Sequence, residues 1–219
     1  MSTDIDPSYL EPNRYVDWTD EAVVAYAHEA GGEGDPRDVA IRLVHDVRDR
    51  LRYTPWNVGL TREAYRASEV VRRSYEQGGH CIDKALLLAA AARARGIPAR
   101  LHFANVRNHV GTARLEEKLG TDLLVFHGYA ELWLEGRWVA ATPAFNRQLC
   151  EKLGVAVLAF DGVHDSVFQA YDRQAGRFME YVDDHGTHAG IPFEQMLEAW
   201  RIHYGIDNGV WPRPDDMAD

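Results

Sequence analysis

The chain has 219 residues, of which 46% are hydrophobic and 26% charged, and its formal net charge is −10 at pH 7. This length and composition predict one globular domain over residues 1–219, with an ordered core from about 17 to 204 and arms at both ends. The acidic balance and the lack of a basic patch exclude a nucleic-acid or anionic-membrane surface, so we expect small molecules or proteins as partners.

The first residues of the chain carry neither the cationic flank nor the apolar core of a signal peptide. No segment is long and apolar enough to span a bilayer, so we expect no membrane contact and a cytoplasmic location. The two cysteines, Cys81 and Cys150, could form at most one disulfide and do not resemble a disulfide framework. Each is therefore expected to be a free thiol.

Helices are predicted first along the chain. Residues 19–32 form an amphipathic helix with Thr19 as a plausible N-cap, and residues 35–53 form a second one with Asp35 as N-cap and Pro36 in the first turn. The segment from Cys81 to Arg95 is apolar around most of its circumference. It is therefore predicted to be a central helix buried on nearly every side.

Strands are predicted next, at residues 99–106, at 123–142 with a tight turn at Glu135-Gly136, and at 167–182 with a turn at Gly176. A final helix is predicted over residues 192–204. Because helices come first and antiparallel strands follow, the fold class is α+β.

The position of Cys81, at the first turn of the buried helix, favours a nucleophile. Unpaired backbone N–H groups and the helix dipole at this position favour a thiolate, so we expect a lowered thiol pKa. Gly78 and Gly79 let the chain turn sharply and leave room for a substrate carbonyl, whose developing oxyanion the Cys81 N–H could bind. The alternative is that Cys81 is a small core residue.

A thiolate nucleophile needs a base, and His127 is the best placed of ten histidines. The Glu135-Gly136 turn fixes the register of the two flanking strands, so that Tyr129 lies opposite Thr142. Side-chain alternation then makes His127 and Thr142 diagonal neighbours on one face of the hairpin, within side-chain reach.

These residues resemble the transglutaminase-like core of the papain-like cysteine enzyme superfamily, in particular its bacterial members. The resemblance covers roughly residues 39–146 and includes the flanking segments "LVHDVRDRLRY" and "ARGIPARLHFA". It implies that Cys81 attacks an amide or ester of a peptide, protein or small molecule to form a thioester, with His127 as general acid and base and no cofactor. Water would resolve the thioester in a hydrolase, and an amine in an acyltransferase. The motifs that carry the resemblance are Gly79-His80-Cys81, His127, Gly136-Arg137-Trp138 and Thr142-Pro143.

One position departs from the family pattern, because Thr142 stands where an Asp usually orients the catalytic histidine. The Thr142 hydroxyl can still hydrogen-bond His127 Nδ1, and it is our first choice for the third catalytic residue, with Asn146 and Asp161 as alternatives. Two other functions stay open. The missing Asp is compatible with a catalytically silent binding domain, and the "GGHC" motif also resembles arylamine acetyltransferases.

Further polar residues have weaker functional interpretations. Gln77 could assist an oxyanion hole, although a role in stabilising its loop is favoured, and His80 either lines the pocket or is exposed. No histidine pair has the regular spacing of a metal site, so we expect no metal. The sets considered were His102, His109 and His127, and His164, Asp184, His185 and His188.

Overall fold

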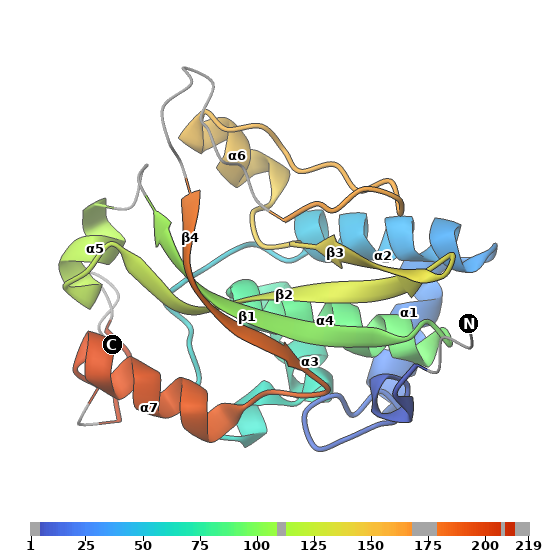
Figure 1. The fold of residues 1–219 in the computed structure, drawn as a ribbon, viewed down its shortest axis with the longest axis horizontal. Coiled ribbons are helices and arrows are strands. Elements are labelled where there is room, and N and C mark those ends of the chain that lie inside the picture. The colour runs from blue at the N-terminus through green and yellow to red at the C-terminus, as the bar shows by residue number, and fades with distance from the viewer. Residues whose placement is uncertain (1–4, 109–112, 168–178, 207–208, 213–219) are drawn as a thin grey trace.

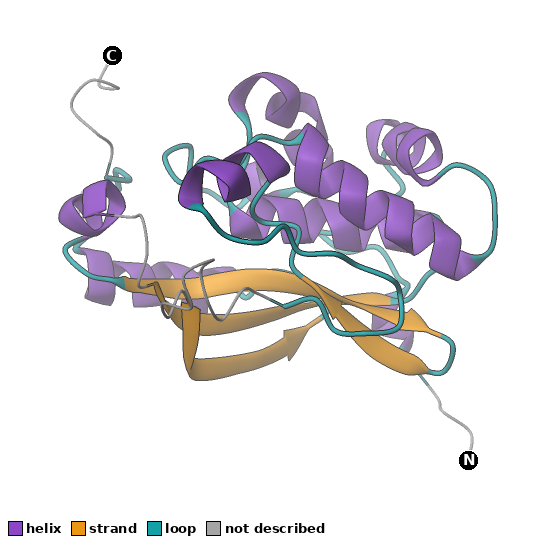
Figure 2. Cartoon of the chain, turned by 90° about the horizontal axis from the view of Figure 1, so that it is seen from above, coloured by secondary structure: helices purple, strands orange, loops and turns teal. Residues whose placement is uncertain are grey.

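The computed structural model describes residues 5–108, 113–167, 179–206 and 209–212. Most of the helices lie on one face of a single antiparallel sheet (Figure 2). The sheet has the strand order β3-β2-β1-β4. The expected α+β class is confirmed. The elements in chain order are α1 (Glu21–Gly31), α2 (Pro36–Arg50), α3 (Ala67–Gln77), α4 (Cys81–Ala94), β1 (Ala99–Asn108), α5 (Ala113–Leu119), β2 (Leu123–Leu134), β3 (Arg137–Ala141), α6 (Arg147–Leu153), β4 (Met179–His188) and α7 (Phe193–Tyr204), with short 3-10 helices at Pro7–Tyr9 and Glu63–Tyr65 (Figure 1).

Helix α4 is the central helix, as its composition predicts. Its alanines and leucines from Ala85 to Ala92 are all fully buried, and it contacts α1, α2, α3, β1 and β2. A helix whose circumference is apolar is stable only when other elements cover every side. The sheet and three helices supply that cover, and the first turn of α4 is thereby fixed against β2.

The first two helices begin near the predicted positions. Helix α2 has Asp35 as its N-cap, with the side chain accepting from Asp38 N, and Pro36 in the first turn, as expected. The N-cap of α1 is Asp20 and not Thr19, because the Asp20 carboxylate accepts from Ala22 N. Both caps satisfy N–H groups that lack partners within the helix.

Three helices were not predicted from the sequence. Helix α3 starts without a side-chain cap, although Val70, Val71 and Ser74 form one buried stripe. Helices α5 and α6 have only seven residues each, too few for a clear helical period. Helix α3 was missed because it lacks a side-chain cap, and α5 and α6 were missed because they are short.

The β2–β3 hairpin has the predicted register, with Trp133 paired to Trp138 across the turn. Glu135 and Gly136 have φ angles of 49° and 86°, which matches a turn with both central residues in the left-handed region. The predicted turn at Gly176 lies outside the described residues, as do residues 1–4 and 213–219 of the predicted arms. Strand β4 pairs antiparallel with β1.

Candidate active site

The first turn of α4 is held by an unusual N-cap, the imidazole of His80. Its Nδ1 accepts from Ile82 N at 3.1 Å and from Asp83 N at 3.3 Å, and its Nε2 lies 3.2 Å from the Tyr65 hydroxyl. Because Nδ1 accepts both bonds, the ring proton resides on Nε2 and is donated to Tyr65. His80 is only 4% exposed, and burial lowers its pKa, so it caps the helix in its neutral form.

Asp83 completes this capping box from inside the helix. Its Oδ2 accepts from His80 N at 3.2 Å and its Oδ1 from Arg73 Nη2 at 2.6 Å, and the carboxylate is fully buried. Arg73 belongs to α3, so this ion pair joins α3 to the first turn of α4. The residue before Cys81 and the residue two after it are thus both held by hydrogen bonds.

The loop before α4 is fixed by backbone pairing with the segment after α2. Gly79 N donates to Arg52 O and Thr54 N donates to Gly79 O, each at 3.0 Å. Gly78 has a φ of 71°, and a Cβ on it would lie 2.4 Å from Arg52 O. Only glycine fits at this position, which confirms that the chain turns sharply just before the cysteine.

Helix α4 approaches β2 closely at Gly128. A Cβ on Gly128 would lie 3.2 to 3.4 Å from atoms of Phe103 and Ile82, so a side chain here would press the first turn of α4 away from the strand. Just before it, Phe126 adopts a φ of 57° at a register shift between β1 and β2, and its N–H donates to Asn105 Oδ1. This irregularity precedes His127 and alters the local course of the strand.

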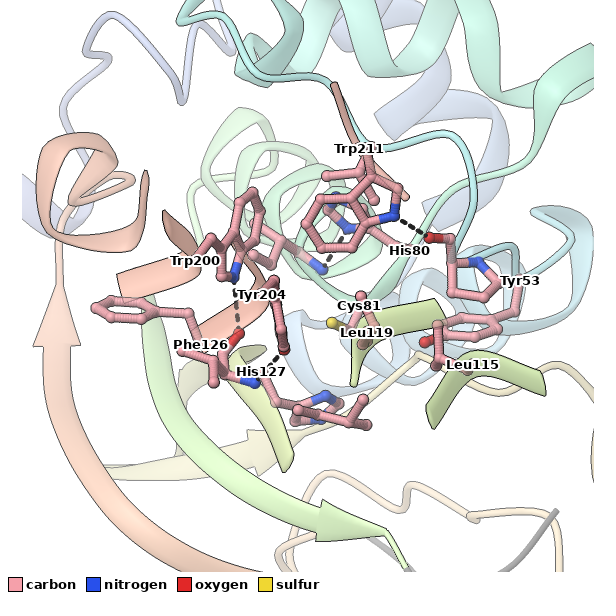
Figure 3. A pocket seen from close by; sticks show the side chains of 15 residues that line it. Tyr53, His80, Cys81, Leu115, Leu119, Phe126, His127, Trp200, Tyr204 and Trp211 are labelled. Carbon is pink, nitrogen blue, oxygen red and sulfur yellow. Dashed lines mark hydrogen bonds between the residues drawn. The ribbon is translucent and has the colours of Figure 1, made fainter. Parts of the chain in front are cut away.

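Cys81 and His127 line the same pocket, as the sequence predicts. The pocket has about 420 Å³ of empty space that opens to solvent, and His80 and Tyr53 also line it. In Figure 3 the Cys81 and His127 side chains enter the pocket from α4 and β2, respectively. The remaining wall is largely apolar and aromatic.

Sequence reasoning missed the aromatic wall of this pocket. Trp200 and Tyr204 come from α7, and Trp211 comes from the segment that follows it. Trp200 and Trp211 pack edge to face with ring centroids 5.0 Å apart. The run of aromatic residues from 200 to 211 was the available signal, but nothing local indicates which distant residues it contacts.

The pKa of the Cys81 thiol is raised to about 11, contrary to the lowered pKa expected at a helix N-terminus. Burial is the largest cause, because a thiolate loses its hydration there. The backbone N–H groups of Gly128 and Ile82 act in the opposite direction and favour the thiolate, but less strongly than burial disfavours it. Cys81 is therefore a neutral thiol in the free protein near neutral pH.

The pKa of His127 is lowered to about 4, mainly by burial and also by the nearby His80. Its side chain is 3% exposed, and neither ring nitrogen has a hydrogen-bond partner among the described residues. The thiol and the imidazole are thus both neutral, and they line one pocket without a hydrogen bond between them. A buried imidazole without a hydrogen-bond partner carries an uncompensated desolvation cost.

The hydrogen bond expected between His127 Nδ1 and the Thr142 hydroxyl is not formed. Thr142 is buried, yet its Oγ1 has no partner within the described residues. The paired residues of the hairpin end at Ala130 and Ala141. Beside them, Ser166 pairs with β3, since Thr142 N donates to Ser166 O and Ser166 N to Ala140 O, each at 2.8 Å.

The two alternative third residues are engaged elsewhere. Asn146 is buried, accepts from Tyr53 N through Oδ1 and donates to Gln148 through Nδ2. Asp161 is an exposed loop residue whose carboxylate accepts from two backbone N–H groups and lies 2.7 Å from His164 Nδ1. Neither lines the pocket.

The remaining sequence candidates are dispersed. Gln77 is exposed and does not line the pocket, while Cys150 is a fully buried thiol, not in a disulfide, in a second apolar cluster. His102 lies between Glu131 and Asp184, at 2.7 Å from each. Among the residues with described side chains, no group of three or more His, Cys, Asp or Glu is arranged to hold a metal ion, and His109 lies outside them.

A family model described as the transglutaminase-like superfamily matches residues 24–143, more than half of the chain. This range contains Cys81, His127 and Thr142. No curated protein matches the chain.

Within the described part of the chain, none of the helices is both long and apolar enough to cross a membrane.

Solved structures similar to the chain include the following three. A candidate cysteine protease from Cytophaga hutchinsonii has 18% sequence identity and a TM-score of 0.47, over 84% of this chain and 55% of that one. The periplasmic domain of TgpA from Pseudomonas aeruginosa, bound to ethylmercury, has 19% identity and a TM-score of 0.44, over 65% and 50%. A candidate protease from Parabacteroides distasonis has 14% identity and a TM-score of 0.37, over 59% and 26%. The chain spans about half the length of the first two.

Proposed function

Because the chain belongs to the transglutaminase-like superfamily, we propose that it is a cysteine-dependent enzyme that cleaves or transfers acyl groups through a thioester on Cys81. The observation that carries this proposal is the pocket that Cys81 and His127 line together, with the thiol at the first turn of a buried helix. The substrate is an amide or ester of a peptide, a protein or a small molecule.

Because the Cys81 thiol and the His127 imidazole are both neutral, the proton of the thiol must move during the attack. As Cys81 Sγ attacks the substrate carbonyl, its proton passes to His127 and a carbon–sulfur bond forms. Collapse of the tetrahedral intermediate breaks the bond to the leaving amine or alcohol, which takes the proton from His127. Water or an amine then attacks the thioester and gives a proton to His127, which returns it to the departing Cys81 sulfur.

Backbone N–H groups are placed to bind the oxyanion. The N–H groups of Cys81 and Gly128 both lie against the thiol, whereas that of Ile82 is already donated to His80. Tyr53 also lines the pocket, and its hydroxyl is a further potential donor. These donors would meet negative charge only as it develops on the carbonyl oxygen, which lowers the barrier of the attack.

Thr142 takes the third position in this proposal. Its hydroxyl and the His127 ring are both buried and unpaired, so a hydrogen bond between them in the imidazolium form would satisfy both groups. We expect Thr142→Val to lower kcat by about tenfold or more, the effect of one hydrogen bond to a charged group. Thr142→Asp should instead raise the pKa of His127 from about 4 by about one unit or more, followed by NMR titration of the ring protons. Full activity of Thr142→Val would remove Thr142 from the mechanism.

A catalytically silent binding domain is the second candidate function. It is favoured by one observation, that no described carboxylate hydrogen-bonds the His127 ring. The two functions separate when the protein is mixed with 4-nitrophenyl acetate, quenched in acid and analysed by mass spectrometry of its peptides. The enzyme acquires an acetyl group on Cys81 and releases 4-nitrophenol in a burst, whereas the silent domain does neither.

The raised thiol pKa predicts a particular pH dependence of alkylation. In the Cys150→Ser protein, the rate of Cys81 alkylation by iodoacetamide should rise throughout the range from pH 6 to 10, because the thiolate fraction grows toward a pKa of about 11. The rate is measured by mass spectrometry at constant ionic strength. A plateau reached below pH 7 would show a preformed thiolate and contradict the neutral pair.

A further inference from the structure

On the basis of the proposed function, we infer that the site selects acyl groups whose chain is uncharged and apolar, and that it discriminates against acyl groups bearing a carboxylate. The acyl group is joined to Cys81 Sγ in the thioester, so the space that the sulfur faces is the space that the acyl chain must occupy. The residues that line the pocket therefore determine which acyl groups the site accepts.

The described residues of the wall carry no formal charge. Figure 3 draws the fifteen lining residues, and none of them is Asp, Glu, Lys or Arg. Leucine side chains from α5 and β2 form one part of the wall, through Leu115, Leu119 and Leu124. An ionised group that enters such a pocket loses its hydration without gaining a counter-charge.

The polar atoms of the aromatic residues in the wall already form hydrogen bonds within the protein. Trp200 Nε1 donates to Val125 O at 2.9 Å, and Trp211 Nε1 donates to Pro55 O at 2.8 Å. The Tyr204 hydroxyl accepts from Val125 N at 2.6 Å and donates to a neighbouring β2 carbonyl at 3.1 Å. These rings therefore offer an acyl chain mainly their apolar surfaces.

The same holds for His80, whose two nitrogens cap α4 and contact Tyr65. Among the described lining side chains, the remaining polar groups are the Cys81 thiol, the His127 ring, whose nitrogens have no partner, and the Tyr53 hydroxyl. The reacting carbonyl and the proton transfers use these groups. Among the described lining residues, no other polar side chain is left to recognise a charged acyl chain.

The test compares two esters that differ only at the far end of the acyl chain, 4-nitrophenyl butyrate and mono-4-nitrophenyl succinate. We expect kcat/KM to favour the butyryl ester by at least about tenfold, a typical discrimination for a pocket that lacks a partner for a polar group. The Cys81→Ala protein supplies the background rate for each ester, which removes their different spontaneous hydrolysis.

A charge placed in the wall should reverse the preference. Leu124 is only partly buried, so a lysine there can keep its ammonium group near water while facing the pocket. In Leu124→Lys the butyryl-to-succinyl ratio should fall by about tenfold or more, whereas Leu124→Met, with an uncharged chain of similar length, should keep the preference for butyryl.

The outcomes are distinguishable. Cys81-dependent turnover with equal or better use of the succinyl ester overturns the inference and leaves the proposed function standing. Absence of Cys81-dependent turnover with both esters overturns the proposed function together with the inference. A succinyl preference that appears only in Leu124→Lys supports both.

Discussion

Cys81→Ala and His127→Ala each reduce the turnover of 4-nitrophenyl butyrate by about a thousandfold or more, to the level of the uncatalysed reaction. The alanine at position 81 removes the nucleophile, and the alanine at position 127 removes the proton acceptor without which a thiol of pKa about 11 stays protonated. The two losses should not add in the double variant, because both residues serve one step.

The fold should survive these substitutions. Cys81 lines an open pocket, and the His127 ring makes no hydrogen bond within the described residues, so its removal breaks none. Circular dichroism and urea unfolding check this point. Cys150→Ser is the matched control, since Cys150 lies in a separate apolar cluster, and its activity per folded molecule should stay close to that of the wild type. Wild-type turnover by either alanine variant would refute the catalytic assignment.

Asp83→Asn should destabilise the protein strongly, because Asp83 joins the cap of α4 to α3. Its fully buried carboxylate accepts from His80 N and Arg73 Nη2, and removing its charge leaves the guanidinium without its ion-pair partner. We expect a loss of about 3 kcal/mol in the free energy of unfolding. This is the lower end for breaking a buried pair, because the Arg73 side chain is 19% exposed. The measurement is urea unfolding with linear extrapolation.

The neighbouring arginine on α3 provides the control. Arg72 pairs with Asp20 and Glu69, but its side chain is 47% exposed. Arg72→Met should therefore change stability much less than Arg73→Met, since surface ion pairs contribute little. Equal losses in the two arginine variants, or an Asp83→Asn protein as stable as the wild type, would show that this buried pair does not hold the first turn of α4.

The sequence by itself determined the elements that depend on local signals. The Asp35-Pro36 start of α2, the apolar circumference of α4 and the tight turn at Glu135-Gly136 each act within a few residues, and the structure has all three. The turn also set the register that pairs Trp133 with Trp138. The ordered motifs around Cys81, His127 and Thr142 were sufficient to identify the superfamily.

Only the tertiary structure decided the chemistry of the site. The predicted register placed Thr142 beside His127, but the paired residues of the hairpin end at Ala130 and Ala141, and Ser166 pairs with β3 from a distant segment, which local turn chemistry cannot foresee. The sign of the Cys81 pKa shift changed for a similar reason. A helix N-terminus favours a thiolate wherever it occurs, whereas the burial that opposes it comes from α7, β2 and Trp211, which are far away in the sequence. Local residue order fixes elements and motifs, but desolvation depends on every segment that packs around a group.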